Sequence, residues 1–180
     1  MKKIILIYGL IAGGIVGAMM MITMPLYESG TLKLDNGEWL GYTTMVIALS
    51  MVFFGVKSYR DNHLGGSITF GNALKVGLLI TLIAALIYAF SWEITRSNMK
   101  GDLLTLMGEK QIEKMKAEGA TEAALVEAKK KNEDFGEMYK NPFIRFAITL
   151  IEIVPVGILI SLLSATLLRE KEFLSAASNS

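Results

Sequence analysis

Long apolar stretches separated by polar segments dominate the pattern of hydrophobic and polar positions along this chain. Four of them cover residues 4–26, 39–56, 74–92 and 143–168. The hydrocarbon core of a bilayer is about 30 Å thick, and a helix that rises about 1.5 Å per residue needs roughly 20 apolar residues to cross it. Each stretch meets or approaches that length. The pattern therefore predicts an all-α integral membrane protein with four transmembrane helices, in a single membrane domain over residues 1–180.

The first stretch follows Met1, Lys2 and Lys3, and so begins as a secretory signal peptide does. The apolar part of a signal peptide has about 7 to 15 residues and ends in a small-x-small cleavage site. This stretch is longer and ends in Met24-Pro25-Leu26. We therefore expect a retained transmembrane helix.

The distribution of Lys and Arg predicts the orientation, because positive residues near helix ends tend to stay in the cytoplasm. With both termini inside, Lys33 is the one basic residue of the opposite 27–38 loop. Segment 93–142 weakens this contrast, because it would lie outside and holds many basic residues, with acidic ones in nearly equal number. The side of the membrane on which a long loop lies depends less on its charge, so we keep this orientation. The cytoplasmic flanks would carry Lys2, Lys3, Lys57, Arg60, Lys75, Arg169 and Lys171.

The charged segment 100–140 has the pattern of a helical hairpin between the third and fourth membrane helices. Apolar residues recur near helical spacing over 102–118 and again over 121–139. Gly119 suits the position just past a helix C-terminus, Thr121 can cap the next N-terminus, and Asn141-Pro142 ends the second helix. We expect this hairpin outside the membrane, either with a simply solvated charged face or as a docking surface for a partner or a second copy.

Small residues recur at intervals of four within three of the apolar stretches. Residues four apart share a helix face, and small ones let two backbones approach closely where lipid offers no hydrophobic drive for association. These faces are predicted to pack the four helices together; the alternative for the first stretch is homodimerisation. The residues are Gly9, Gly13 and Gly17, then Ala73, Gly77, Thr81 and Ala85, then Gly157, Ser161 and Ala165.

Glu152 is chemically out of place in the fourth stretch. It lies about nine residues inside, roughly 14 Å deep at helical rise, where a charge costs at least about 2.5 to 3.5 kcal/mol. We expect it to face the bundle interior as a hydrogen-bonded neutral acid, because no Lys, Arg or His lies at the depth of its expected neighbours, Gly17, Ser50 and Thr81. Pro155 removes an amide donor one turn later and should kink the helix.

Glu152 and Pro155 together form a candidate intramembrane polar site with two principal interpretations. An intramembrane acid beside a proline is what a small proton-coupled carrier or channel subunit uses to bind and release a proton. The alternative is a structural carboxyl that fixes the register of the helices; contact with lipid or a cofactor is a third option. Equal proton leak with Glu152 and with glutamine there would exclude the carrier.

The remaining chemistry is sparse. A net charge of +1 with interleaved signs gives no nucleic-acid footprint, and without Cys there is no thiolate metal site or thiol nucleophile. No hydrolase, metalloprotease, nucleotide-binding or dinucleotide motif occurs, so we expect no enzyme, no catalytic residue, no metal and no cofactor. His63, the one histidine, is expected in a solvated loop. The basic residues beside that loop are expected to contact lipid headgroups, or a phosphorylated ligand: Lys57, Arg60 and Lys75.

Four segments resemble a small bacterial family of four-helix membrane proteins known only as a domain of unknown function. They are residues 54–61 (FGVKSYRD), 65–77 (GGSITFGNALKVG), 139–142 (YKNP) and 152–165 (EIVPVGILISLLSA). The resemblance implies a bacterial cytoplasmic membrane location but no activity or site residues. We therefore expect a non-enzymatic membrane protein, structural or interacting, whose partners are the lipid bilayer and either a second copy or another membrane protein.

Overall fold

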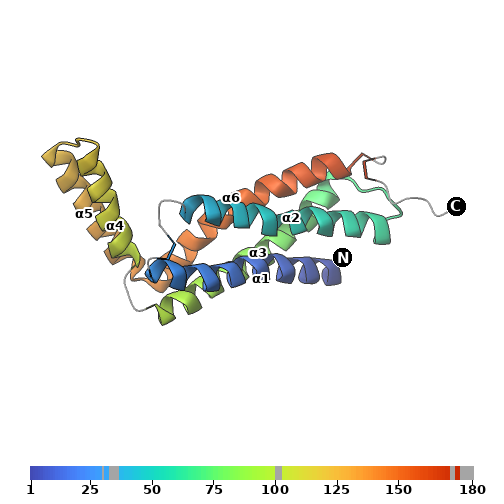
Figure 1. The fold of residues 1–180 in the computed structure, drawn as a ribbon. Coiled ribbons are helices and arrows are strands. Elements are labelled where there is room, and N and C mark those ends of the chain that lie inside the picture. Colours follow the sequence, from blue (N-terminus) through green and yellow to red (C-terminus); the bar gives the residue numbers. More distant parts are fainter. Residues whose placement is uncertain (30, 33–36, 100–102, 171–172, 175–180) are drawn as a thin grey trace.

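The chain is all-α in the computed structural model, which describes residues 1–29, 31–32, 37–99, 103–170 and 173–174; over these it has six helices and no strand. Four long helices form a bundle, and two shorter ones extend from one end of it (Figure 1). The all-α prediction is confirmed, and by length and composition each bundle helix is apolar enough to cross a membrane. The bundle comprises α1 (Lys2–Glu28), α2 (Gly37–His63), α3 (Phe70–Asn98) and α6 (Pro142–Leu168), and the shorter helices are α4 (Leu103–Ala117) and α5 (Glu122–Tyr139).

The bundle helices continue past the apolar stretches that predict them. In α2 the extension runs through polar residues to His63, and Lys57 pairs with Asp61 one turn later at 2.7 Å. The helix then stops before Gly65 and Gly66, whose positive φ values of 64° and 86° suit glycine. The expectation of His63 in a loop was therefore wrong, because hydropathy marks where lipid contact ends and not where the helix ends.

Large apolar side chains cover the outside of the bundle, and small residues take many of its buried positions. Leu10, Phe90 and Leu163 point outward and are 58%, 61% and 62% exposed, whereas Ala84 and Ser161 are fully buried. A large outer apolar surface suits lipid, and small inner residues allow the close backbone approach on which helix association in lipid depends. The arrangement of the side chains thus supports the membrane assignment independently of helix length.

Helices α1 and α3 run parallel, and the first glycine stripe lies in their contact. A Cβ built on Gly9 would come within 2.7 Å of Ile83 Cβ, and one on Gly13 within 2.7 Å of Ile87 Cβ. Gly17 is similarly close to Ser91. The contacting residues are spaced four apart on both helices, so the glycine stripe of α1 packs against α3 of the same chain.

Helices α3 and α6 run antiparallel, and their small residues alternate across the contact. Gly77 lies against Ser161, and Gly157 lies against Thr81. Thr81 Oγ1 donates to the Gly157 carbonyl at 3.4 Å and lies 3.3 Å from Ser161 Oγ. Gly55 of α2 also lies very close to other helices, at Ile80 and Tyr8. It belongs to no stripe of small residues at four-residue spacing, so the sequence did not predict this contact.

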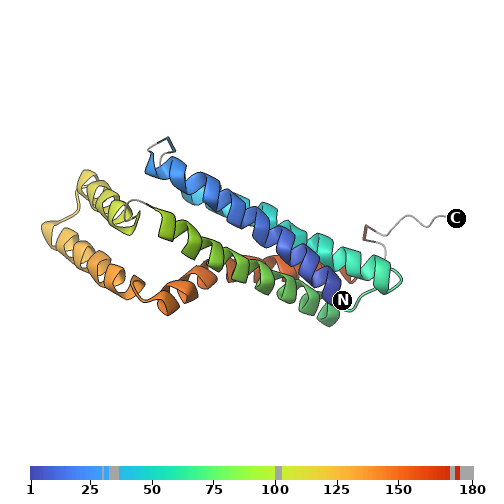
Figure 2. The same cartoon turned by 90° about the horizontal axis from the view of Figure 1, so that it is seen from below.

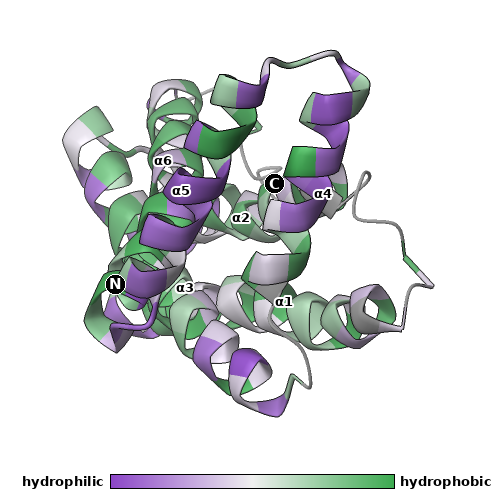
Figure 3. Cartoon of the chain, turned by 90° about the vertical axis from the view of Figure 1, so that its left-hand side faces the viewer, coloured by the Kyte–Doolittle hydropathy of each residue, from purple (hydrophilic) through white to green (hydrophobic). Residues whose placement is uncertain are grey.

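Helices α4 and α5 lie side by side and are the most hydrophilic part of the fold (Figure 3). Gly119 between them has a φ of 80°, and the Thr121 side chain accepts from the Ala124 amide at 3.3 Å. Where they touch, a Cβ on Gly108 would lie 3.1 Å from Asn132 Nδ2. Figure 2 shows the pair leaving the bundle at the end opposite the N-terminus.

Candidate intramembrane site

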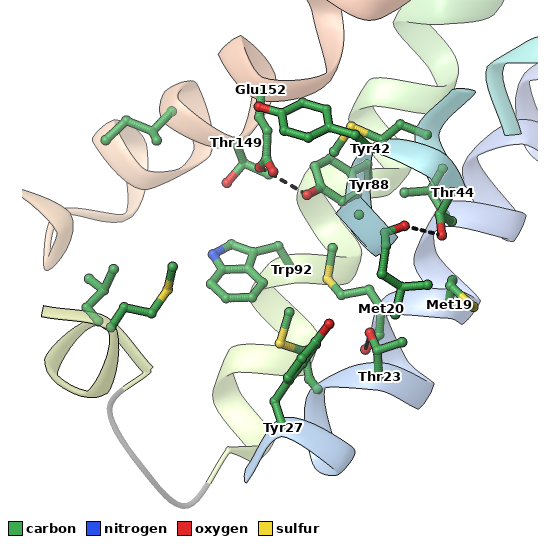
Figure 4. Close-up of a pocket in the computed structure, with 18 of the residues that line it drawn as sticks. Met19, Met20, Thr23, Tyr27, Tyr42, Thr44, Tyr88, Trp92, Thr149 and Glu152 are labelled. Carbon is green, nitrogen blue, oxygen red and sulfur yellow. Dashed lines mark hydrogen bonds between the residues drawn. The ribbon is translucent and has the colours of Figure 1, made fainter. Parts of the chain in front are cut away.

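A cavity of about 530 Å³ lies at the end of the bundle from which α4 and α5 extend (Figure 4). All six helices contribute to its lining. Helix α3 presents Tyr88 and Trp92 to this cavity, whereas nearer its start it presents Gly77 and Thr81 to α6. Large side chains hold two helices further apart than small ones do. The cavity thus lies where the side chains along α3 change from small to large.

Glu152 is exposed within this cavity and accepts a hydrogen bond at Oε2 from the Tyr88 hydroxyl, 3.0 Å away. The sequence located the acid but not its partner. The expected neighbour, Thr81, lies against Gly157 instead, so the register of α3 on α6 brings Glu152 opposite Tyr88, two helical turns further along. Thr149, one turn from Glu152, also lines the cavity but donates its hydroxyl to the Arg145 carbonyl.

The cavity walls are largely aromatic rings and thioethers. Thioether side chains are flexible and polarisable, and so adapt to ligands of different shape. The aromatic residues are Tyr27, Tyr42, Tyr88, Trp92, Phe135 and Tyr139. The methionines are Met19, Met20, Met24, Met45 and Met107.

Polar contacts tie α5 to the bundle beside the cavity. Trp92 Nε1 donates to the Tyr139 hydroxyl at 2.6 Å. Arg145 makes a two-pronged ion pair with Glu93, with nitrogen to oxygen distances of 2.5 and 2.7 Å, and donates to the Tyr139 carbonyl at 3.0 Å. Burial raises the pKa of the Tyr139 phenol above its usual range, so its hydroxyl keeps its proton at neutral pH.

Pro155 lies inside α6 one turn beyond Glu152 and is exposed. It is not among the residues that line the cavity. The predicted pair is therefore adjacent in the helix, but the structure brings Glu152 together with Tyr88 and not with Pro155. The predicted packing residues lie at the helix contacts outside the cavity: Gly9, Gly13, Gly17, Gly77, Gly157 and Ser161.

The expectation that Arg60 contacts lipid headgroups was wrong. Its side chain is fully buried, and its guanidinium donates to Asp61 at 2.7 Å and to the carbonyls of Phe173 and Leu174 at 2.8 and 2.9 Å. The polar extension of α2 carries it to the C-terminal end of α6, where carbonyls lack helical partners. Lys57 is a quarter exposed and pairs with Asp61, and Lys75 is exposed.

Several residues of this site carried no distinctive sequence signal. Tyr88 and Trp92 look like ordinary members of an apolar stretch, and the cavity depends on residues from all six helices. Glu93 and Arg145 could have been found, because they are opposite charges at matching ends of two adjacent antiparallel stretches. Among the described residues, no group of three or more His, Asp or Glu side chains is placed to hold a metal ion.

Comparison with known proteins gives a family match over nearly the whole chain. No curated protein and no solved structure matches. A family model described as a protein of unknown function (DUF4199) matches residues 7–170, a range that takes in all six helices except the first five residues of α1. The chain therefore belongs to this DUF4199 family.

Proposed function

We propose that this chain is a non-enzymatic, multi-pass protein of the bacterial cytoplasmic membrane that binds a small apolar or amphipathic molecule in the cavity between its bundle and the α4–α5 pair. The observation that carries this proposal is the cavity itself. Small-molecule sites typically have volumes of about 300 to 1,000 Å³, mostly apolar walls and a few well-placed polar groups. The cavity of about 530 Å³, with Glu152 and its Tyr88 partner in an otherwise largely apolar wall, has these properties.

The proposed topology has both termini in the cytoplasm and the α4–α5 pair, a helical hairpin, outside the membrane. The chain begins at one end of the bundle, where the α2–α3 connection also lies, and the α4–α5 pair leaves from the other (Figure 1). The first end carries Lys2, Lys3, Lys57 and Lys75, as the positive-inside tendency favours. The charged faces of α4 and α5 suit water, and offer a surface for a second copy or another membrane protein.

The binding proposal is tested with Trp92 as a reporter. The chain has two tryptophans, and Trp39 is 79% exposed, so Trp39→Phe leaves Trp92 alone in the cavity wall. The uncharged fluorophore N-phenyl-1-naphthylamine accepts energy from tryptophan. We expect its emission, excited through Trp92 in detergent-purified protein, to show a saturable component above the linear partitioning into detergent.

The matched control fills the cavity. Gly41 lines it, and a Cβ built there meets no atom within 4 Å, so a side chain can start from this position and Gly41→Phe adds a ring at the cavity wall. In the Trp39→Phe background this change should remove the saturable component and leave the linear part. Linear emission alone in both proteins would refute the binding proposal.

A small proton-coupled carrier is the second candidate, and the exposure of Glu152 in the cavity favours it. An acid accessible from a cavity can exchange its proton, whereas a sealed carboxyl cannot. We expect proteoliposomes with the wild-type chain to leak protons faster than those with Glu152→Gln, as measured with an entrapped pH dye. Equal rates at equal protein density would exclude the carrier and leave the binding proposal intact.

A further inference from the structure

The cavity lining contains an acidic side chain, which the binding of a purely apolar molecule does not require. Its lining includes one carboxylate, Glu152, and none of the described lining residues is Lys, Arg or His. The hydrogen bond from Tyr88 stabilises a carboxylate at this position, because charge-assisted hydrogen bonds are about twice as strong as neutral ones. A carboxylate without a cationic partner is costly in an apolar setting such as this cavity wall.

The charged side chains nearest to Glu152 on α3 and α6 do not supply that partner. Arg145 lies two turns away along α6, roughly 10 Å at helical rise, and its guanidinium is held by Glu93 and the Tyr139 carbonyl. Lys57 and Arg60 belong to the opposite end of the bundle, where both pair with Asp61. A ligand that brings its own positive charge would therefore supply the partner that the described lining residues do not give Glu152.

The aromatic walls suit the same kind of charge. The faces of Tyr and Trp rings attract cations, and cages of such rings are a recurrent way of binding quaternary ammonium groups. Tyr88 and Trp92 stand on α3 beside Glu152, and Tyr42 reaches the same region from α2 (Figure 4). Rings and thioethers would surround the apolar body of a ligand whose charge lies at the carboxylate.

We infer that the cavity binds a lipophilic organic cation, with its positive charge beside Glu152 and its apolar body against the aromatic and methionine side chains. This inference rests on the binding function proposed above and adds the class of ligand. An anion of the same shape would face an unpaired carboxylate and should be disfavoured.

The test uses two rigid ions of nearly identical shape and opposite charge, tetraphenylphosphonium and tetraphenylborate. Each ion is titrated against N-phenyl-1-naphthylamine bound to Trp39→Phe protein, and the loss of fluorophore emission is measured. The titration is done with Glu152 intact and with Glu152→Gln. We expect Glu152→Gln to raise the concentration of the cation needed for half displacement about tenfold and to leave that of the anion unchanged or lower. Partitioning into detergent is the same for both proteins and cancels in this comparison.

Two controls keep the result specific. Glutamine retains a carbonyl acceptor for Tyr88, and an unchanged unfolding midpoint checks that Glu152→Gln is folded; Glu137→Gln, an exposed acid of α5 outside the cavity, should shift neither ion. If Glu152→Gln does not fold, the two ions are compared on the Glu152 protein after correction for partitioning into protein-free micelles. There the cation should displace the fluorophore at the lower free concentration.

The outcomes separate the two proposals. If Glu152→Gln shifts both ions equally, or neither, the cavity does not select cations and the inference is wrong, although the saturable fluorophore signal still supports the binding function. The same holds if neither ion displaces the fluorophore. If the fluorophore itself shows no saturable signal, the binding function fails and the inference fails with it.

Discussion

Replacing Gly13 by leucine should disrupt the packing of α1 on α3 and lower the stability of the folded bundle by several kcal/mol. A Cβ at this position would already lie 2.7 Å from Ile87 Cβ and 2.8 Å from its Cδ1, and leucine adds three more carbons beyond it. The Cβ of Ile87 is fixed to its helix backbone and cannot turn aside. Insertion of extra methylenes into a tight contact typically costs about 1 to 3 kcal/mol, and more where two backbones must separate.

The matched control is the next residue. A Cβ on Gly14 meets no atom within 4 Å, so Gly14→Leu adds the same side chain to the same helix on its open face. Thermal unfolding in detergent, followed by loss of the monodisperse chromatographic peak, should show a lower midpoint for Gly13→Leu than for Gly14→Leu. Equal midpoints would show that the glycine stripe does not pack the helices as described.

The spacing of small residues identified helix faces but not their partners. Gly9, Gly13 and Gly17 mark one side of α1, and periodicity leaves open whether another span or a second copy covers it. The structure covers it with Ile83 and Ile87, which are ordinary apolar residues in the sequence. Pairing depends on how four helices fit together in three dimensions, and local spacing does not contain that information.

The sequence predicted the site residues that are unusual for their surroundings and missed those that are ordinary there. An acid in an apolar stretch is costly, so Glu152 stood out from the sequence alone. Tyr88 did not, because a tyrosine in a membrane helix needs no special explanation until its hydroxyl is seen 3.0 Å from the acid. The error at Arg60 has the opposite origin, since a basic residue at a span end normally reaches the headgroups and here meets carbonyls from the C-terminal segment instead.

The bundle is divided into a tightly packed end and an open end. Small side chains pack α3 against α6 at Gly77 and Gly157, and large ones surround the cavity near Tyr88. At the open end Gly17 of α1 still lies close to Ser91 of α3, but α3 carries the large side chains of Tyr88 and Trp92 in the cavity wall. Polar bonds also hold α5 and α6 in position there, and the two-pronged ion pair between Glu93 and Arg145 is a charge-assisted one.

Replacing Arg145 by leucine should consequently destabilise the fold by about 3 kcal/mol. The Arg145 side chain is 8% exposed and that of Glu93 is 30% exposed, so the substitution leaves a partly buried carboxylate without its partner. Removal of one member of a buried pair typically costs about 3 to 5 kcal/mol, and partial access to water places Glu93 at the lower end. The Tyr139 carbonyl also loses its donor, so α4 and α5 should become more sensitive to protease than the bundle.

A double variant and an exposed pair distinguish lost charge pairing from lost packing. Glu93→Leu with Arg145→Leu removes both charges and should recover part of the stability, because no unpaired carboxylate is left. Lys140→Leu breaks an ion pair with Glu137 whose two side chains are 70% and 73% exposed, and should leave the unfolding midpoint nearly unchanged. If Arg145→Leu is no more destabilising than Lys140→Leu, the ion pair does not hold the open end of the bundle together.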